Sequence, residues 1–237
     1  FYRFYAPNNA ILSIAGNICF DETIRLVEKW FGPIPRREVH PRMLPQEPKQ
    51  TEIRRMTVER DVPLDTLYMA FHTCNRTHPD YYAVDMLSDL LANGSSSRLI
   101  EHLVKQKQIF SQIDAYITGS FDEGLLKITG KPLPGISLEE AEAYIWQELE
   151  TLCQTMPEEK ELEKVKNRYE AEQTIKSVNF LNNAVNMAYF ELIGQAEDVN
   201  DEVRNYHSVT PQDIQRVANK VFKEENSSVL YYKAVSQ

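Results

Sequence analysis

The chain lacks the features by which membrane proteins and nucleic-acid-binding proteins are recognised from sequence. No run approaches the ~18 consecutive apolar residues that a membrane-spanning helix needs. Lysine and arginine number 26 against 35 aspartates and glutamates, so the net charge is −9. This excess of acid argues against nucleic acid, because phosphate contacts need a field of positive charge. We therefore expect neither a membrane nor a nucleic acid as a partner, and the compartment stays open between cytoplasm and periplasm.

Cysteine and histidine are also scarce, and they do not form a recognisable site. The three cysteines, Cys19, Cys74 and Cys153, are odd in number and far apart, so they fit neither a disulfide framework nor metal-ligand spacing. The segment Arg98–His102 is the nearest approach to the His-x-x-Glu-His helix of inverted zincins, but Arg98 stands where the first histidine is needed. A guanidinium has no lone pair to give a metal. We therefore predict no metal site and no catalytic residue within this chain.

Proline is concentrated in one short segment. Five of the twelve prolines fall between residues 33 and 48, a density that a packed element does not tolerate. This predicts an extended linker at 33–50, which separates a short region at 1–32 from a larger unit at 51–237. Within the short region, apolar residues from Ala10 to Ile18 predict a strand. The pattern from Asp21 to Phe31 predicts an amphipathic helix.

The larger unit alternates pairs of strands with pairs of helices. Strands are predicted around 53–58, 66–71, 109–118, 124–130 and 228–235, and helices at 78–91, 95–106, 137–154, 157–194 and from 210 onward. In the longest of these helices the spacing predicts one buried stripe: Leu162, Val165, Tyr169, Ile175, Val178, Leu181, Val185, Ala188 and Leu192. Hairpin-type strand pairs separated by helices favour an α+β fold, in which an antiparallel or mixed sheet has helices packed on one face.

The beginning of the chain is echoed near its end. Four pairs of similar residues stand at one constant offset: Phe4 and Phe222, Asn8 and Asn226, Ile11 and Val229, Leu12 and Leu230. Both stretches predict the end of a helix, a polar turn that carries Asn, and then an apolar strand. Such repetition is typical of a duplicated protein, and chance similarity is the alternative that so few matches leave open.

Several short segments, each weak alone, are specific in combination. They are Tyr5-Ala-Pro-Asn-Asn-Ala-Ile-Leu, Val27–Pro35, Leu87–Gly94 with Ser96-Ser97-Arg98-Leu99, Asp114-Ala-Tyr with Asp122-Glu-Gly-Leu, and Glu161–Lys166. Together they resemble the insulinase-like (pitrilysin-type) zinc metallopeptidases, which are built from two duplicated α/β halves. The resemblance covers essentially the whole chain. The first two segments match the end of the catalytic repeat, and the others match the second, non-catalytic repeat, one half of a clamshell.

The resemblance implies a division of labour between the two repeats. In the family the zinc-binding helix and a later Glu ligand belong to the first repeat. Zinc is therefore expected in the full-length protein but outside this chain, and the chain alone is expected to be inactive. The implied partners are a peptide substrate, the missing N-terminal half of the same protein, and a second copy or a related subunit. The alternative is a non-catalytic partner or scaffold subunit of the same family that lacks the metal motif.

The resemblance also points to residues that contact substrate. Many members carry an Arg and a Tyr seven residues apart on and just after a strand that matches Gly124 to Leu133. Here those positions are Leu126 and Leu133, with Lys127 adjacent to the first. We predict substrate contacts from three residues: Arg98, Tyr116 and Lys127. For Arg98 a structural role, or a place on the surface between the halves, is favoured over direct contact with substrate.

Overall fold

The computed structural model describes residues 4–39, 45 and 47–235. The chain divides into two compact units. One, here called the first unit, comprises Phe1–Pro48 and Glu170–Val203, and the other, the sheet unit, comprises Lys49–Tyr169 and Arg204–Gln237. Part of the linker predicted at 33–50, namely residues 40–44 and 46, lies outside the described residues. Among the described residues, no helix combines the length and hydrophobicity that crossing a bilayer requires.

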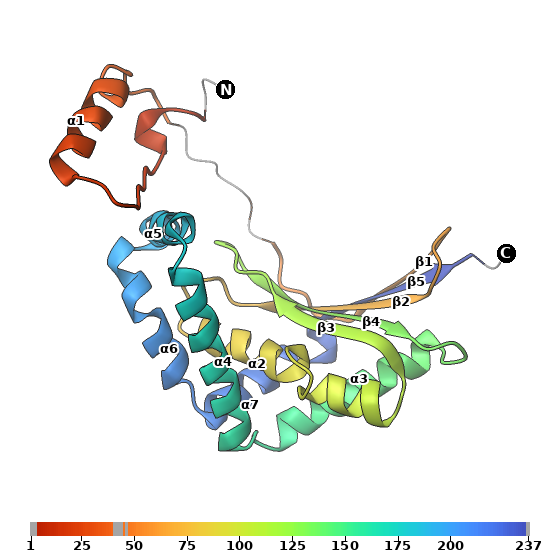
Figure 1. Ribbon diagram of the computed structural model, residues 1–237. Helices are drawn as coiled ribbons and strands as arrows, with labels where there is room; N and C mark the ends of the chain where they lie inside the picture. The colour runs from red at the N-terminus through yellow and green to blue at the C-terminus, as the bar shows by residue number, and fades with distance from the viewer. Residues whose placement is uncertain (1–3, 40–44, 46, 236–237) are drawn as a thin grey trace. The chain divides into compact units, whose positions relative to one another are not determined.

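The sheet unit is built on one five-stranded mixed sheet (Figure 1). Its strands are β1 (Arg54–Arg60), β2 (Thr66–Thr73), β3 (Phe110–Ile117), β4 (Gly124–Pro132) and β5 (Ser227–Ala234), in the order β1-β5-β2-β4-β3. The last strand is inserted between the first two, parallel to β1 and antiparallel to β2. The five strands predicted for residues 51–237 are all present, and the predicted α+β class with a mixed sheet is confirmed.

Helices pack on one face of this sheet (Figure 1). They include α2 (Tyr81–Ala92), α3 (Leu138–Gln154) and α7 (Pro211–Val221). Burial along β4 alternates strictly, which places every second side chain against these helices. The core between the two layers is apolar and includes Leu67, Phe71, Leu87, Ile128 and Val217, each at most 1% exposed.

Local sequence signals explain where these helices begin. The side chain of Ser137 accepts a hydrogen bond from the backbone N–H of Glu140 at the start of α3. Thr210 and Asp213 form a reciprocal capping box at the start of α7, with Pro211 at its first position. These side chains satisfy backbone N–H groups that have no partner within the helix. The helix predicted at 95–106 is also present, with π-helical geometry over Ile100–Gln106.

The long helix predicted at 157–194 is two helices, α4 (Glu159–Ser177) and α5 (Phe180–Ile193). The chain leaves the helix before Phe180 because the side chain of Asn179 caps α5, accepting hydrogen bonds from the N–H groups of Leu181 and Asn182. Two short helices follow: η3 (Ala196–Asp201) and α6 (Glu202–Ser208).

The single buried stripe predicted for that stretch is wrong beyond Tyr169. Leu162 and Val165 are buried, but Ile175 and Val178 are 73% and 80% exposed. Residues 170–203 belong to the first unit and not to the sheet unit, so the second half of the apolar pattern has no core of the sheet unit to pack against. Helical spacing predicts which residues share a face, but it does not predict what covers them.

The strand predicted from Ala10 to Ile18 is also wrong. The segment has no strand conformation, and no described strand pairs with it. Its apolar side chains are largely exposed, among them Leu12 at 54%. The pattern is that of a strand, but a strand forms only where a neighbour accepts its hydrogen bonds. The helix predicted after it is present as α1 (Phe20–Phe31), preceded by Cys19 as the N-cap residue.

The echoed segments nevertheless share a local conformation. A 3₁₀ turn, η1 (Pro7–Asn9), precedes the first apolar segment, and a second one, η4 (Glu224–Asn226), precedes β5. In both copies the matched asparagine bridges to distant backbone: Asn8 donates to the carbonyl of Arg37, and Asn226 donates to that of His72. The copies differ in burial, because only the second has a sheet to enter.

Candidate functional site

The sheet unit leaves one face of its sheet without a helix. The guanidinium of Arg55 donates to Glu142 of α3, so Arg55 lies on the face that the helices cover. Successive strand residues point to opposite faces, and the adjacent Met56 is 63% exposed. The uncovered face therefore consists of the even-numbered residues of β1, β2 and β5. It also includes the even-numbered residues of β3 from Gln112 on and the odd-numbered residues 125–131 of β4.

Two of the three predicted site residues meet on this uncovered face. Tyr116 of β3 lies directly opposite Lys127 of β4 in the antiparallel register. The Lys127 ammonium is 5.8 Å from the centre of the Tyr116 ring, a distance at which a cation is attracted to the ring's face. Tyr116 is 49% exposed. The pair presents a phenol hydroxyl and a charge to anything that lies against the sheet.

Further aromatic and apolar groups extend the uncovered face toward β1. The rings of Tyr68 and Tyr232 meet edge to face, with centroids 6.3 Å apart. In the register, Met56 lies beside Leu230, and Leu230 lies beside Tyr68. Such surfaces suit an extended chain, because tyrosine offers both apolar area and a hydrogen-bonding group at little cost in side-chain entropy.

The third predicted site residue, Arg98, belongs to the helical layer. Its guanidinium makes two parallel hydrogen bonds to the carboxylate of Glu161 in α4, at 2.9 and 2.8 Å. The two side chains are only 15% and 21% exposed. A bidentate pair of this geometry fixes both side chains. It fastens α4 to the helical segment that precedes β3, which favours the structural role for Arg98.

A buried carboxylate ties the edge of the sheet to the helices and so keeps the uncovered face in register. Glu142 of α3 accepts hydrogen bonds from Arg55 of β1, Tyr231 of β5 and Trp146 of its own helix. Burial raises the pKa of Glu142, but these hydrogen bonds outweigh burial and hold its pKa below the usual value. The carboxylate is therefore ionised at neutral pH.

The residues that resembled a metal motif are in contact with other side chains. His102 Nδ1 lies 2.7 Å from the carboxylate of Glu148, and Glu101 pairs with Lys105. Within residues 4–39, 45 and 47–235, no three histidine, cysteine or acidic side chains are grouped as metal ligands would be. Burial raises the pKa of the Cys74 and Cys153 thiols, so neither thiol is an activated nucleophile.

Comparison with known proteins identifies the family. Residues 1–169 match the model of the family described as the peptidase M16 inactive domain. The chain belongs to this family. It is 27% identical to zinc protease PqqE of Helicobacter pylori over 233 residues, which cover 97% of this chain and 52% of that protein. The inactive domain spans about half the length of the curated relatives it matches, between 52% and 55%.

Solved structures show the same fold as this inactive domain. A protease from Helicobacter pylori superposes with a TM-score of 0.86 at 26% identity, over 92% of this chain and 54% of that one. The inactive peptidase domain of a putative zinc protease from Bordetella parapertussis superposes with a TM-score of 0.66 at 19% identity, over 74% of this chain and 96% of that one. The predicted membership in the insulinase-like peptidases is therefore confirmed.

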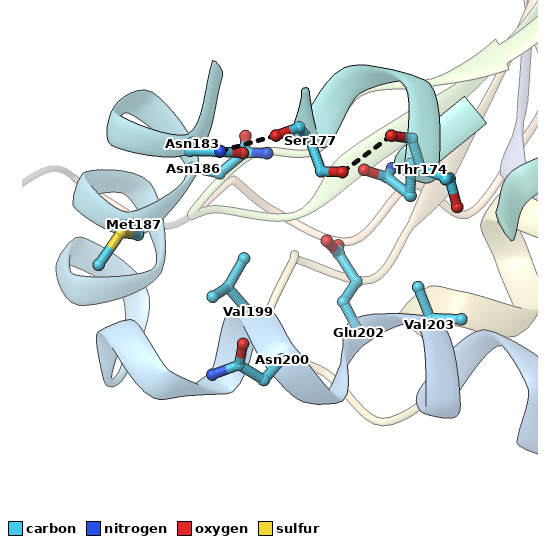
Figure 2. A pocket seen from close by; sticks show the side chains of 10 residues that line it. Thr174, Ser177, Asn183, Asn186, Met187, Val199, Asn200, Glu202 and Val203 are labelled. Carbon is cyan, nitrogen blue, oxygen red and sulfur yellow. Dashed lines mark hydrogen bonds between the residues drawn. The ribbon is translucent and has the colours of Figure 1, made fainter. Parts of the chain in front are cut away.

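The inactive domain also has a cavity in its first unit, of about 420 Å³. Figure 2 shows its walls, which come from the end of α4, from α5, and from η3 and α6. The Asn183 amide donates to the carbonyl of Ser177, and the Ser177 hydroxyl donates to that of Thr174. Four of the ten lining residues carry amides, and its one carboxylate is Glu202. The cavity has neither the cations nor the aromatic rings of the uncovered face.

Sequence reasoning missed most of the uncovered face. Met56, Tyr68 and Tyr232 come from three strands far apart in the chain, and only the order β1-β5-β2 brings them together. Alternation of side chains within each strand is the signal that shows which residues share a face. Alternation does not predict the order of the strands in the sheet, which decides which of these residues are neighbours.

Proposed function

We propose that this inactive domain forms one wall of a chamber that encloses a peptide in a zinc-dependent metallopeptidase. The observation that carries the proposal is the family match, together with curated relatives that are zinc proteases about twice as long as this chain. The zinc and the catalytic groups belong, in this proposal, to a preceding half of the same protein. There the metal would activate water for attack on the peptide bond. The compartment, cytoplasm or periplasm, stays a prediction.

The region before the linker supports the existence of a preceding half. Residues 4–32 expose large apolar side chains, including Phe20 at 74% and Trp30 at 65%. Exposure of many such groups in a short region marks a surface that another protein segment covers. We propose that residues 1–32 end the first repeat, that 33–50 link the repeats and that 51–237 form the second one. Pairing through the same surface with a second copy or a related subunit stays a prediction.

The uncovered face is the part of the wall that meets the substrate. Tyr116 and Lys127 are adjacent, accessible and able to donate hydrogen bonds to the carbonyl groups of an extended peptide. Because they bind rather than react, their role is to hold the substrate in position while the other half performs the chemistry. Arg98, paired with Glu161, acts in this proposal by holding the fold.

Kinetics of the full-length protein test this role of the uncovered face. The double variant Tyr116→Ala, Lys127→Ala is expected to raise KM for peptide hydrolysis by about tenfold, the equivalent of about 1.4 kcal/mol of binding. Its kcat and zinc content should be unchanged. Lys105→Ala, which changes an exposed lysine of the helical layer, is the control. An unchanged KM in the double variant would rule out contact between substrate and this pair.

A further inference from the structure

We infer that the uncovered face selects acidic peptides, and that it reads two carboxylates four residues apart in an extended chain. The inference rests on the proposed function, because it names the class of substrate that the same face receives. It starts from an imbalance of charge. The uncovered face carries four cations, Arg54, Arg60, Lys127 and Lys131, and one acid, Asp114. The chain as a whole has a net charge of −9.

The cations of the two faces differ in whether they are paired with carboxylates. On the covered face Arg55 pairs with Glu142, and Lys233 pairs with Glu139. On the uncovered face none of the four cations forms a salt bridge with another residue that the structure describes. The fold therefore neutralises the charges that face its helices and leaves those on the uncovered face available to a ligand.

The register places two of these cations in one row across the sheet. Arg54 lies beside Ser228, Ser228 beside Ala70, and Ala70 beside Lys127. The two cations are thus separated by two strands whose side chains in this row are small, and the Ser228 hydroxyl donates a hydrogen bond to the side chain of Gln50. The row has a positive charge at each end, with Tyr116 beyond Lys127. The neighbouring row is bulkier, since it contains Met56, Leu230 and Tyr68.

The length of this row sets the spacing of the ligand's charges. Neighbouring strands lie about 4.8 Å apart, so the three steps from Arg54 to Lys127 cover about 14 Å. An extended peptide advances about 3.4 Å per residue, and about four residues therefore span the row. Residues i and i+4 of an extended chain point to the same side. A peptide that crosses the strands can thus place carboxylates at i and i+4 on the two cations, with its backbone over Ser228 and Ala70.

Anisotropy titrations of labelled nine-residue peptides into this chain test the inference. The peptides share one sequence and differ only at positions i, i+2 and i+4, with Glu at i and i+4, Gln at i and i+4, Lys at i and i+4, or Glu at i and i+2. The first is expected to bind about tenfold more tightly than the Gln peptide. It should lose this advantage as salt is raised, because salt screens exposed charges.

Variants of the row identify the site of binding. Arg54→Gln and Lys127→Gln should each weaken the Glu i, i+4 peptide more than the Gln peptide, and Lys105→Gln should change neither. Both substitutions lie on an exposed face, and circular dichroism checks that the fold is intact. Equal binding of the Glu, Gln and Lys peptides would overturn the acidic preference and leave the proposed function standing. Equal binding of the two Glu spacings would overturn the row geometry. No binding of any peptide would overturn the proposed role of this face as well.

Discussion

Replacing Phe71 with alanine is expected to lower the free energy of unfolding by about 3–5 kcal/mol. Phe71 lies in β2, the central strand, with none of its surface exposed. Its ring meets Trp146 of α3 and Phe222 at the end of α7 edge to face, with centroids 5.5 and 5.2 Å apart. The substitution therefore opens a cavity at the point where two helices meet the sheet. Because whole domains are stable by only about 5–15 kcal/mol, the loss is a large fraction of the total.

Urea unfolding followed by circular dichroism measures this loss. Phe71→Leu keeps most of the buried volume and should cost much less, about 1 kcal/mol. Phe121→Ala is the matched control, because Phe121 lies in the turn between β3 and β4 and is 54% exposed. Equal unfolding midpoints for the Phe71→Ala and Phe121→Ala variants would show that the core does not centre on Phe71.

Replacing Glu142 with glutamine is expected to cost about 2–3 kcal/mol at neutral pH. Removing one member of a buried ion pair costs roughly 3–5 kcal/mol, and the half-exposed side chain of Arg55 reduces this figure. The amide also accepts weaker hydrogen bonds from Tyr231 and Trp146 than the carboxylate does. Detachment of α3 from the edge of the sheet is the expected structural consequence.

The cost of this substitution depends on pH in a defined direction. The pKa of Glu142 is lower in the folded protein than the usual value of a glutamate, 4.5. Its stabilising contribution is thus fully present above about pH 4.5 and is lost as the pH falls through the folded-state pKa. The stability gap between the wild type and Glu142→Gln should close in acid. Urea titrations at pH 7 and pH 3 measure it, with Glu150→Gln on the exposed side of α3 as control. A gap of equal size at both pH values would contradict the assignment.

The predictions from sequence that held are those that depend on neighbours in the chain. Thr210 and Asp213 are three residues apart and specify the start of α7 by themselves. The hairpin of β3 and β4 follows from two apolar segments joined by a short turn, and it also brings Tyr116 opposite Lys127. Such features can be predicted because the interacting groups are close in sequence.

The predictions that failed concern what an apolar segment packs against. Ala10–Ile18 has a strand's pattern but no pairing strand among the described residues, and the stripe beyond Tyr169 has helical spacing but lies exposed. The row from Arg54 to Lys127 was missed for a related reason, since it depends on the insertion of β5 between β1 and β2. Periodicity within a segment contains no information about a partner far away in the chain.

The most direct test of whether this inactive domain is the non-catalytic wall of a zinc peptidase is to measure peptide hydrolysis and bound zinc. Both are measured with and without the proposed preceding half of the protein. Alone, the chain should bind no stoichiometric zinc and hydrolyse no peptide. Added to a separately produced preceding half, it should bring about hydrolysis that a chelator abolishes and zinc restores. Stoichiometric zinc in the isolated chain would contradict this division of labour. Hydrolysis that is equally fast with the preceding half alone would also contradict it. A full-length protein that binds no zinc and hydrolyses no peptide would instead indicate a non-catalytic partner subunit.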